Sequence, residues 1–325
     1  MKRYFRLPLA ALLSLLVVFA LAACGSDDEK PAAEKPAAEA PSTQIKSDPA
    51  NTSKGTITVG SKNFTEQFIL GEIYPQTLEA LGFKVQKRLN LGSEQVAFKA
   101  LTSGQVDAYP EYTGTALTNF FDVKTKDVPK DPAEAYELNK EGFAKAKVTT
   151  LPPTPFDNTF RVTATAATAK KYGNPKTITE LFEKAPSLSI SGFPECRQRT
   201  DCLLGLKSVY GYKGKFVSSN GKYNDLDKGT SVLTFGFGTD PQLLLEDKYV
   251  DFDDDKKLFP PYNISLNVRD DAIEKIGTSG QEAIVAVQKG LTADAMRELN
   301  RRVDLEKQEP EAVAKAYLTE SGFVK

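Results

Sequence analysis

From residue 56 onward, short β-rich runs alternate with segments that repeat apolar residues at helical spacing. Residues 56–60 form a β-branched run that ends on glycine, and helically spaced apolar residues then continue up to Gly82. A second strand over 83–89, a helix over 93–103 and a third strand over 106–109 extend the pattern. Strands that alternate with helices of this length are typical of βαβ units. We therefore predict an α/β fold built on a parallel sheet.

The first 23 residues have the pattern of an export signal. A basic start precedes the apolar run 7–23, and small residues lie directly before Cys24. This run is short for a membrane span, which needs about 20 apolar residues. The end of the run resembles the lipobox of bacterial lipoproteins, in which the cysteine is acylated and holds the protein on a membrane without spanning it. The alternative is a plain signal peptide with an unrelated cysteine.

Residues 24–55 are expected to form a lipid-bearing cysteine followed by a flexible tether. They are rich in Pro, Ala, Glu, Lys, Ser and Asp and show no apolar periodicity. Such a segment buries too little apolar surface to offset the entropy lost on ordering. The folded part then covers about 270 residues, enough for one large domain or two lobes.

The composition excludes several classes of function. Lysine and arginine number 42 against 43 acidic residues, so nothing in the charge balance favours a nucleic-acid partner. The chain has no histidine, which removes the commonest general base and the commonest metal ligand. No phosphate-binding loop or nucleophile motif is present. We therefore expect neither a cofactor nor a metal, and no enzymatic activity.

Cys196 and Cys202 are the two cysteines left after Cys24. In an exported chain, oxidation of two cysteines this close together is permitted, and we predict a disulfide that closes a short loop. The alternatives are two free thiols or half of a metal site, for which the sequence offers no further Cys or His.

Two proline-rich segments divide the folded part. Pro152, Pro153 and Pro155 interrupt the chain before the β-like run 159–165, and a second stiff segment covers 258–262. We interpret both as crossings between lobes. The expected first lobe comprises residues 57–157 and 262–325, and the expected second lobe comprises 158–261. This organisation predicts a hinged two-lobe clamp.

Four aromatic residues lie at predicted strand ends or loops, where the cleft of a clamp would be. They are Tyr112, Phe160, Phe237 and Tyr262. For any one of them alone, packing in the core is the alternative interpretation.

Five segments spread along the chain carry a resemblance to a known family. They are Val59 to Gln67, Pro110 to Thr115, Val209 to Tyr212, Gly238 to Asp240 and Phe259 to Tyr262. In these segments the chain resembles the substrate-binding lipoproteins of ABC importers for glycine betaine, proline betaine, choline and similar osmoprotectants. The resemblance extends from about residue 56 to residue 325.

The resemblance implies a type II periplasmic-binding-protein fold, with two α/β lobes, two crossing strands and a ligand in the cleft. By position, Tyr112, Phe160, Phe237 and Tyr262 would form an aromatic box, with Asn158 at its edge. The partners of the ligand carboxylate would be Lys62, Thr115 and Arg199. A quaternary ammonium has no N–H to donate, but aromatic faces attract it at about 0.5–2 kcal/mol per face. Arginine offers a carboxylate two donors, and lysine offers a compact charge.

The chain departs from the family at Phe160 and Phe237, where tyrosine is common. Phenylalanine keeps the aromatic face but loses the hydroxyl, which leaves the preferred ligand open and admits a bulkier solute. We expect a carboxylated betaine, because choline would leave Lys62 and Arg199 unpaired.

Functions other than import are also compatible with the sequence. A choline-specific protein and a sensor or scaffold that binds another metabolite are alternatives. An enzyme would need a catalytic pair, for which Glu111 and Glu195 are the candidates. The expected protein is a monomer anchored outside the cytoplasm, which closes on its ligand and is recognised by an ABC permease.

Overall fold

The computed structural model describes residues 44–325. The predicted signal peptide, Cys24 and the predicted tether up to residue 43 lie outside the described residues. None of the helices between residues 44 and 325 is both long and apolar enough to cross a bilayer.

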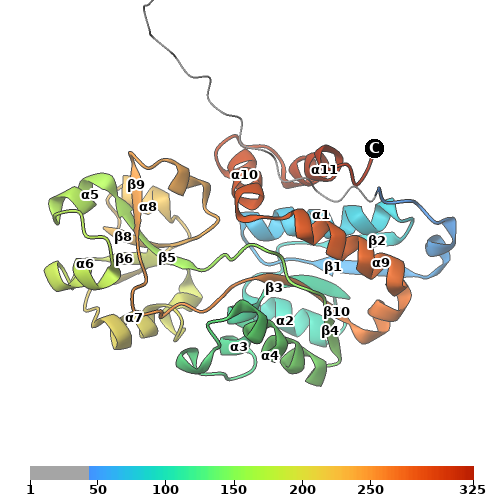
Figure 1. The fold of residues 1–325 in the computed structure, drawn as a ribbon, viewed down its shortest axis with the longest axis horizontal. Helices are drawn as coiled ribbons and strands as arrows, with labels where there is room; N and C mark the ends of the chain where they lie inside the picture. Colours follow the sequence, from blue (N-terminus) through green and yellow to red (C-terminus); the bar gives the residue numbers. More distant parts are fainter. Residues whose placement is uncertain (1–43) are drawn as a thin grey trace, which may run out of the picture. The chain divides into compact units, whose positions relative to one another are not determined.

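Two five-stranded sheets organise the described chain (Figure 1). The first has the order β2-β1-β3-β10-β4. Its strands are β1 (Thr56–Gly60), β2 (Lys84–Arg88), β3 (Ala108–Tyr112), β4 (Val148–Thr150) and β10 (Ile264–Arg269). The second has the order β7-β6-β8-β5-β9. Its strands are β5 (Phe160–Thr165), β6 (Ile190–Gly192), β7 (Phe216–Ser218), β8 (Leu233–Phe237) and β9 (Tyr249–Phe252). We call each sheet with its helices a lobe, and the predicted two-lobe α/β fold is confirmed.

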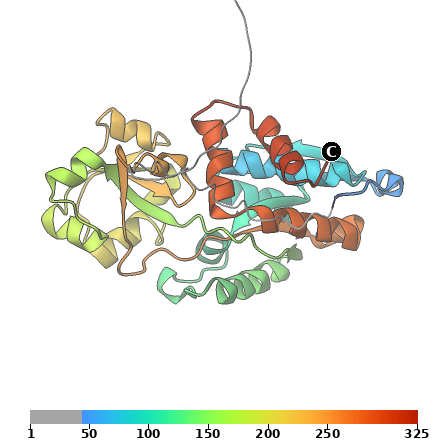
Figure 2. The same cartoon turned by 45° about the horizontal axis from the view of Figure 1, so that its top comes forward.

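Helices accompany both sheets. The first lobe contains α1 (Thr65–Ala80), α2 (Glu94–Thr102), α3 (Thr113–Asn119), α4 (Pro132–Lys145), α9 (Asp270–Gly290), α10 (Ala293–Asp304) and α11 (Pro310–Glu320). The second contains α5 (Ala166–Lys171), α6 (Ile178–Lys184), α7 (Leu203–Tyr210) and α8 (Tyr223–Asp227). Helix α1 packs against α9, α10 and α11, which places the C-terminal helices beside the start of the fold (Figures 1 and 2). Most of α1 is therefore buried.

The prediction of a parallel sheet is wrong for part of each lobe. Strands β2, β1 and β3 are parallel, but β10 runs antiparallel to both β3 and β4. In the second lobe, β6 is parallel to β7 and β8, whereas β5 is antiparallel to β8 and β9. The cause is that β5 and β10 directly follow the crossings between the lobes. Neither strand therefore enters its sheet through the helical crossover that makes neighbouring strands parallel.

Two crossings connect the lobes. The chain leaves the first sheet after Thr150 and enters the second at Phe160, and it returns between Phe252 and Ile264. The crossings are bridged antiparallel to each other at Asp157 and Asn263. The Asp157 carboxylate also accepts a hydrogen bond of 2.8 Å from the backbone N–H of Tyr262. These bonds hold the two crossings side by side at the boundary between the lobes.

The predicted tether does not stay free up to residue 55. The N–H of Ile45 donates to the carbonyl of Phe323 at 2.9 Å, and a 3-10 turn covers Pro49–Ser53. Within that turn, Asn51 is buried and donates to the carbonyl of Leu81 at 2.8 Å. Backbone and side-chain hydrogen bonds thus hold the chain against the first lobe from Ile45, so the tether prediction is wrong for this stretch.

Candidate functional site

A cavity of about 720 Å³ lies among residues of both lobes. All eight residues predicted from the sequence to contact a ligand line it. They are Lys62, Tyr112, Thr115, Asn158, Phe160, Arg199, Phe237 and Tyr262. The structure brings them together, and their role in binding remains a prediction.

Strand register explains how the aromatic rings meet. In the antiparallel pair β5–β8, Phe160 is directly opposite Phe237, so both side chains project from the same face. Their ring centroids are 5.1 Å apart. Tyr262, on the returning crossing, meets the Phe160 ring almost edge-on at 5.4 Å. Tyr112 ends β3 and reaches the same cavity from the first lobe.

Two further rings belong to this group and were missed in the sequence. Phe64 lies 6.1 Å from Tyr112 and 6.2 Å from Phe237 between ring centroids, and so links the rings of the two lobes. Phe193 stacks on Phe160 at 6.0 Å. Phe64 falls within the Val59 to Gln67 segment that carried the family resemblance, and its position just before a predicted helix was the available signal.

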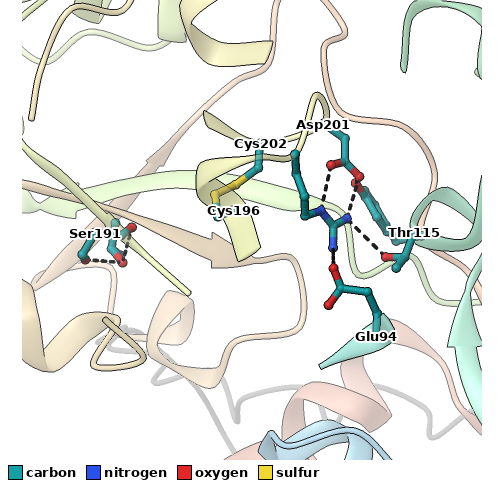
Figure 3. Close-up of a disulfide and its surroundings, with 9 residues drawn as sticks. Glu94, Thr115, Ser191, Cys196, Asp201 and Cys202 are labelled. Atoms are coloured by element: carbon teal, nitrogen blue, oxygen red, sulfur yellow. Dashed lines mark hydrogen bonds and ion pairs between the residues drawn. A yellow bond between two sulfur atoms is a disulfide. The ribbon is translucent and has the colours of Figure 1, made fainter. Parts of the chain in front are cut away.

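Arg199 is the centre of a buried ion cluster, and its partners Glu94, Thr115 and Asp201 are labelled in Figure 3. Its guanidinium donates to both carboxylate oxygens of Asp201, from Nε at 2.8 Å and from Nη2 at 2.6 Å. It also donates to Glu94 at 3.2 Å and to the Thr115 hydroxyl at 3.4 Å. Glu94 and Thr115 belong to the first lobe and Arg199 to the second, so this cluster joins the two lobes.

Asp201 receives donors from both lobes. The hydroxyls of Tyr262 and Thr118 donate to it at 2.5 and 3.0 Å. Burial acts to raise the pKa of Asp201, but the charge of Arg199 and these hydrogen bonds outweigh it and lower the pKa. Asp201 is therefore a buried, ionised partner of Arg199.

Lys62 is also paired with an internal carboxylate. Its ammonium binds Glu111, which is fully buried and also accepts from the Tyr109 hydroxyl at 3.0 Å. The Lys62 nitrogen lies 4.4 Å from the centroid of the Tyr112 ring. Burial raises the pKa of Glu111, and the charge of Lys62 opposes the rise.

These pairs correct one expectation. We expected Lys62 and Arg199 to await a ligand carboxylate and to be left unpaired by choline. That premise is wrong, because buried carboxylates of the protein itself neutralise both cations. Glu111, which was nominated as half of a catalytic pair with Glu195, is likewise tied to Lys62.

Glu66 and Lys222 are site residues that the sequence did not reveal. Glu66, in the first turn of α1, lines the cavity and receives a hydrogen bond of 2.9 Å from the amide of Asn158. Lys222 lies 4.9 Å from the centroid of the Phe237 ring and forms a 2.6 Å ion pair with Asp240. In a sequence, an acidic residue in the first turn of a helix indicates only favourable helix-end electrostatics. A lone lysine indicates a solvated surface.

Comparison with known proteins decides the family. Residues 55–320 match the substrate binding domain of ABC-type glycine betaine transport systems. The chain belongs to this family. It is thus the substrate-binding component of an ABC transport system, and this family consists of binding proteins rather than enzymes.

The individual proteins compared with the chain share 24–28% of its residues. The chain is 28% identical to the carnitine transport binding protein OpuCC of Listeria monocytogenes, over 84% of this chain and 89% of that protein. It is 27% identical to the ergothioneine transport permease/ergothioneine binding protein EgtU of Helicobacter pylori, over 82% of this chain. The match spans 48% of that longer protein. A crystal structure described as a glycine betaine/carnitine/choline ABC transporter shares the fold, with a TM-score of 0.66 and 24% identity, and the match covers 82% of this chain and 99% of that one.

The structure contains the predicted disulfide between Cys196 and Cys202, whose Cα atoms are 5.4 Å apart. Figure 3 shows the bond next to the Arg199 cluster. The closed loop carries both Arg199 and Asp201. Covalent closure of the loop thus limits where this ion pair can be placed.

Replacing both cysteines by serine is expected to lower the free energy of unfolding by about 2 kcal/mol, because a short closed loop restricts the unfolded chain. Urea denaturation of the purified protein would measure the change. A reducing agent should cause the same loss in the wild type and leave the double serine variant unchanged. Equal stability of the oxidised and reduced wild type would contradict the prediction.

Proposed function

We propose that this protein captures a small quaternary-ammonium solute, a betaine such as glycine betaine or carnitine, for an ABC importer. The observation that carries the proposal is the convergence of Tyr112, Phe160, Phe237 and Tyr262 on one cavity. Several aromatic faces around one methylated cation act together, and each contributes more as water is excluded. The named relatives that bind carnitine and ergothioneine support a solute of this class.

The carboxylate of a betaine would meet Thr115, Lys62 and Arg199. Both cations keep hydrogen-bond donors beyond those spent on internal partners, because an ammonium has three N–H groups and a guanidinium has five. A ligand carboxylate can therefore join the existing pairs rather than replace them. By the same argument choline is a second candidate, since a ligand without a carboxylate leaves neither Lys62 nor Arg199 unpaired.

Closure on the ligand is part of the proposal. Several hydrogen bonds cross between the lobes, including Arg199 to Glu94 and Asn300 to the carbonyl of Thr239 at 3.1 Å. A ligand held by rings of both lobes would add to these contacts and favour the closed form. An ABC permease would then recognise that form. The export signal and Cys24 support a lipid anchor outside the cytoplasm, and the proposal includes a protein that acts there as a monomer.

Isothermal titration calorimetry against glycine betaine, carnitine and choline tests this proposal. Replacing Phe160 by leucine keeps an apolar side chain but removes an aromatic face, and is expected to weaken binding by about 3- to 30-fold. Tyr172→Ala removes an aromatic ring that does not line the cavity and should leave the affinity unchanged. If Phe160→Leu bound the solute as tightly as the wild type, the proposal of an aromatic box would be contradicted. If none of the solutes produced heat on titration, this class of ligand would be excluded.

A further inference from the structure

Glu66 occupies an unusual place in the cavity. Its side chain is buried and lines the same cavity as the rings that are proposed to hold the ammonium. The Tyr112 hydroxyl donates to its Oε1 at 2.8 Å. The hydroxyl of Thr239, two residues after Phe237, contacts its Oε2. A negative charge on Glu66 would therefore lie next to the space in which a cation is proposed to bind.

Glu66 also differs from the other buried carboxylates on the cavity wall. Glu94 is paired with Arg199, and Asp240 is paired with Lys222. Among residues 44–325, no lysine or arginine forms an ion pair with Glu66. A buried carboxylate without a cationic partner is costly when it is ionised.

The hydrogen bonds around Glu66 are all satisfied only if the Glu66 carboxyl group itself carries a proton. The amides of Asn158 and Asn300 each donate to one of its oxygens, at 2.9 and 3.0 Å. The Thr239 hydroxyl has a single hydrogen but faces two acceptors, Glu66 Oε2 and, at 2.8 Å, Asn158 Oδ1. If Glu66 carries a proton, Glu66 donates to Thr239, Thr239 donates to Asn158, and every contact has its hydrogen.

We propose that Glu66 is the counter-charge of the bound ammonium, that it is protonated when no cation is in the cavity, and that cation binding releases this proton to solvent. The inference rests on the proposed function. In the exchange, the O–H bond of Glu66 breaks, the electron pair stays on the carboxylate, and the positive charge of the ligand replaces that of the proton. The hydroxyl hydrogen of Thr239 can then turn toward Glu66.

The groups around Glu66 are consistent with this exchange. Burial raises the pKa of Glu66, hydrogen bonds from Thr239, Tyr112 and Asn300 oppose the rise, and the charge of Asp240 adds to it. The pKa values of the neighbouring phenols of Tyr112 and Tyr74 are also raised by burial, so both stay neutral. A bound cation favours the ionised form and lowers the pKa of Glu66. Binding must therefore tighten as the pH rises toward the ligand-free pKa, by up to about tenfold per pH unit, and must level off above that pKa.

Calorimetry of the full chain in buffers with different ionisation enthalpies counts the protons released. Choline is the first probe because it has no carboxylate, and glycine betaine is the second. We expect up to one proton released per ligand at pH values below the raised pKa of ligand-free Glu66, with affinity that rises with pH in that range. In Glu66→Gln, which keeps the shape of the protonated side chain, both the release and the pH dependence should disappear. A thermal melt of that variant checks its fold.

The outcomes separate this inference from the proposed function. Tight binding by the wild type with no proton released would overturn the role of Glu66 and leave the binding function standing. Proton release that persists in Glu66→Gln but disappears in Glu195→Gln, another carboxyl group on the cavity wall, would also overturn it. Absence of binding by either probe at every pH would overturn the proposed function, and this inference with it.

Discussion

Replacing Arg199 by alanine is expected to lower the free energy of unfolding by about 3–5 kcal/mol, because it leaves buried carboxylates without their cation. Asp201 is fully buried and loses two hydrogen bonds, and Glu94 loses one. The same change removes the donor to Thr115 and breaks a connection between the lobes. Urea denaturation at neutral pH would measure the loss.

The pH dependence of this variant gives a sharper test. Without Arg199, burial is expected to raise the pKa of Asp201 above its value in the unfolded chain. A buried group with a raised pKa destabilises the fold at high pH and less so as it takes up a proton. The difference between the wild type and Arg199→Ala should therefore shrink as the pH falls from about 7 to about 4.

Arg161→Ala is the matched control for Arg199→Ala. Arg161 forms a partly exposed pair with Asp251 at 3.7 Å, and pairs of this kind contribute about 0–1 kcal/mol. A loss for Arg199→Ala no larger than for Arg161→Ala would show that the buried cluster is not a stabilising element.

The second large effect is expected at Lys62. Replacing Lys62 by methionine keeps most of the apolar stem but removes the charge beside Glu111, and should cost about 3–5 kcal/mol. Glu111 is fully buried, so solvent cannot take the place of the ammonium. The double variant Lys62→Met with Glu111→Gln should recover much of this loss, because no buried charge remains.

A double-mutant cycle from urea denaturation measures the coupling between Lys62 and Glu111. Lys248→Met, which disrupts an exposed pair with Asp227, serves as the control and should leave the stability nearly unchanged. If Glu111→Gln failed to rescue Lys62→Met, the cost would come from lost packing rather than from an unpaired charge.

Much of the architecture followed from local patterns in the sequence. Strand β1 covers the predicted residues 56–60, and helix α2 lies within the predicted helix 93–103. The order of the first strands and helices of the first lobe was visible because side chains at helical spacing bury one face, whereas β-branched runs favour extended chain. Strand β10 was missed, although Ile264, Leu266 and Val268 alternate with polar residues. It is buried on both faces, and its position in the sheet follows from pairing with β3 and β4.

The candidate site likewise has features that could be predicted from the sequence and features that could not. The aromatic and basic residues that line the cavity could be named from the family resemblance, because the segments that carry it are spread along the chain and place them by position. The partners of those residues could not. Lys62 meets Glu111 across 49 positions, Arg199 meets Glu94 across 105, and Glu66 meets Thr239 across 173.

The sequence by itself thus determined the fold class, the two lobes and the types of side chain that line the cavity. Only the tertiary structure decided how those side chains are charged and paired. The physical reason is that the state of a buried ionisable group depends on its nearest neighbours and on its exclusion from water. Both are set by contacts between segments that are distant in the chain, such as α1 and the turn after β8 around Glu66.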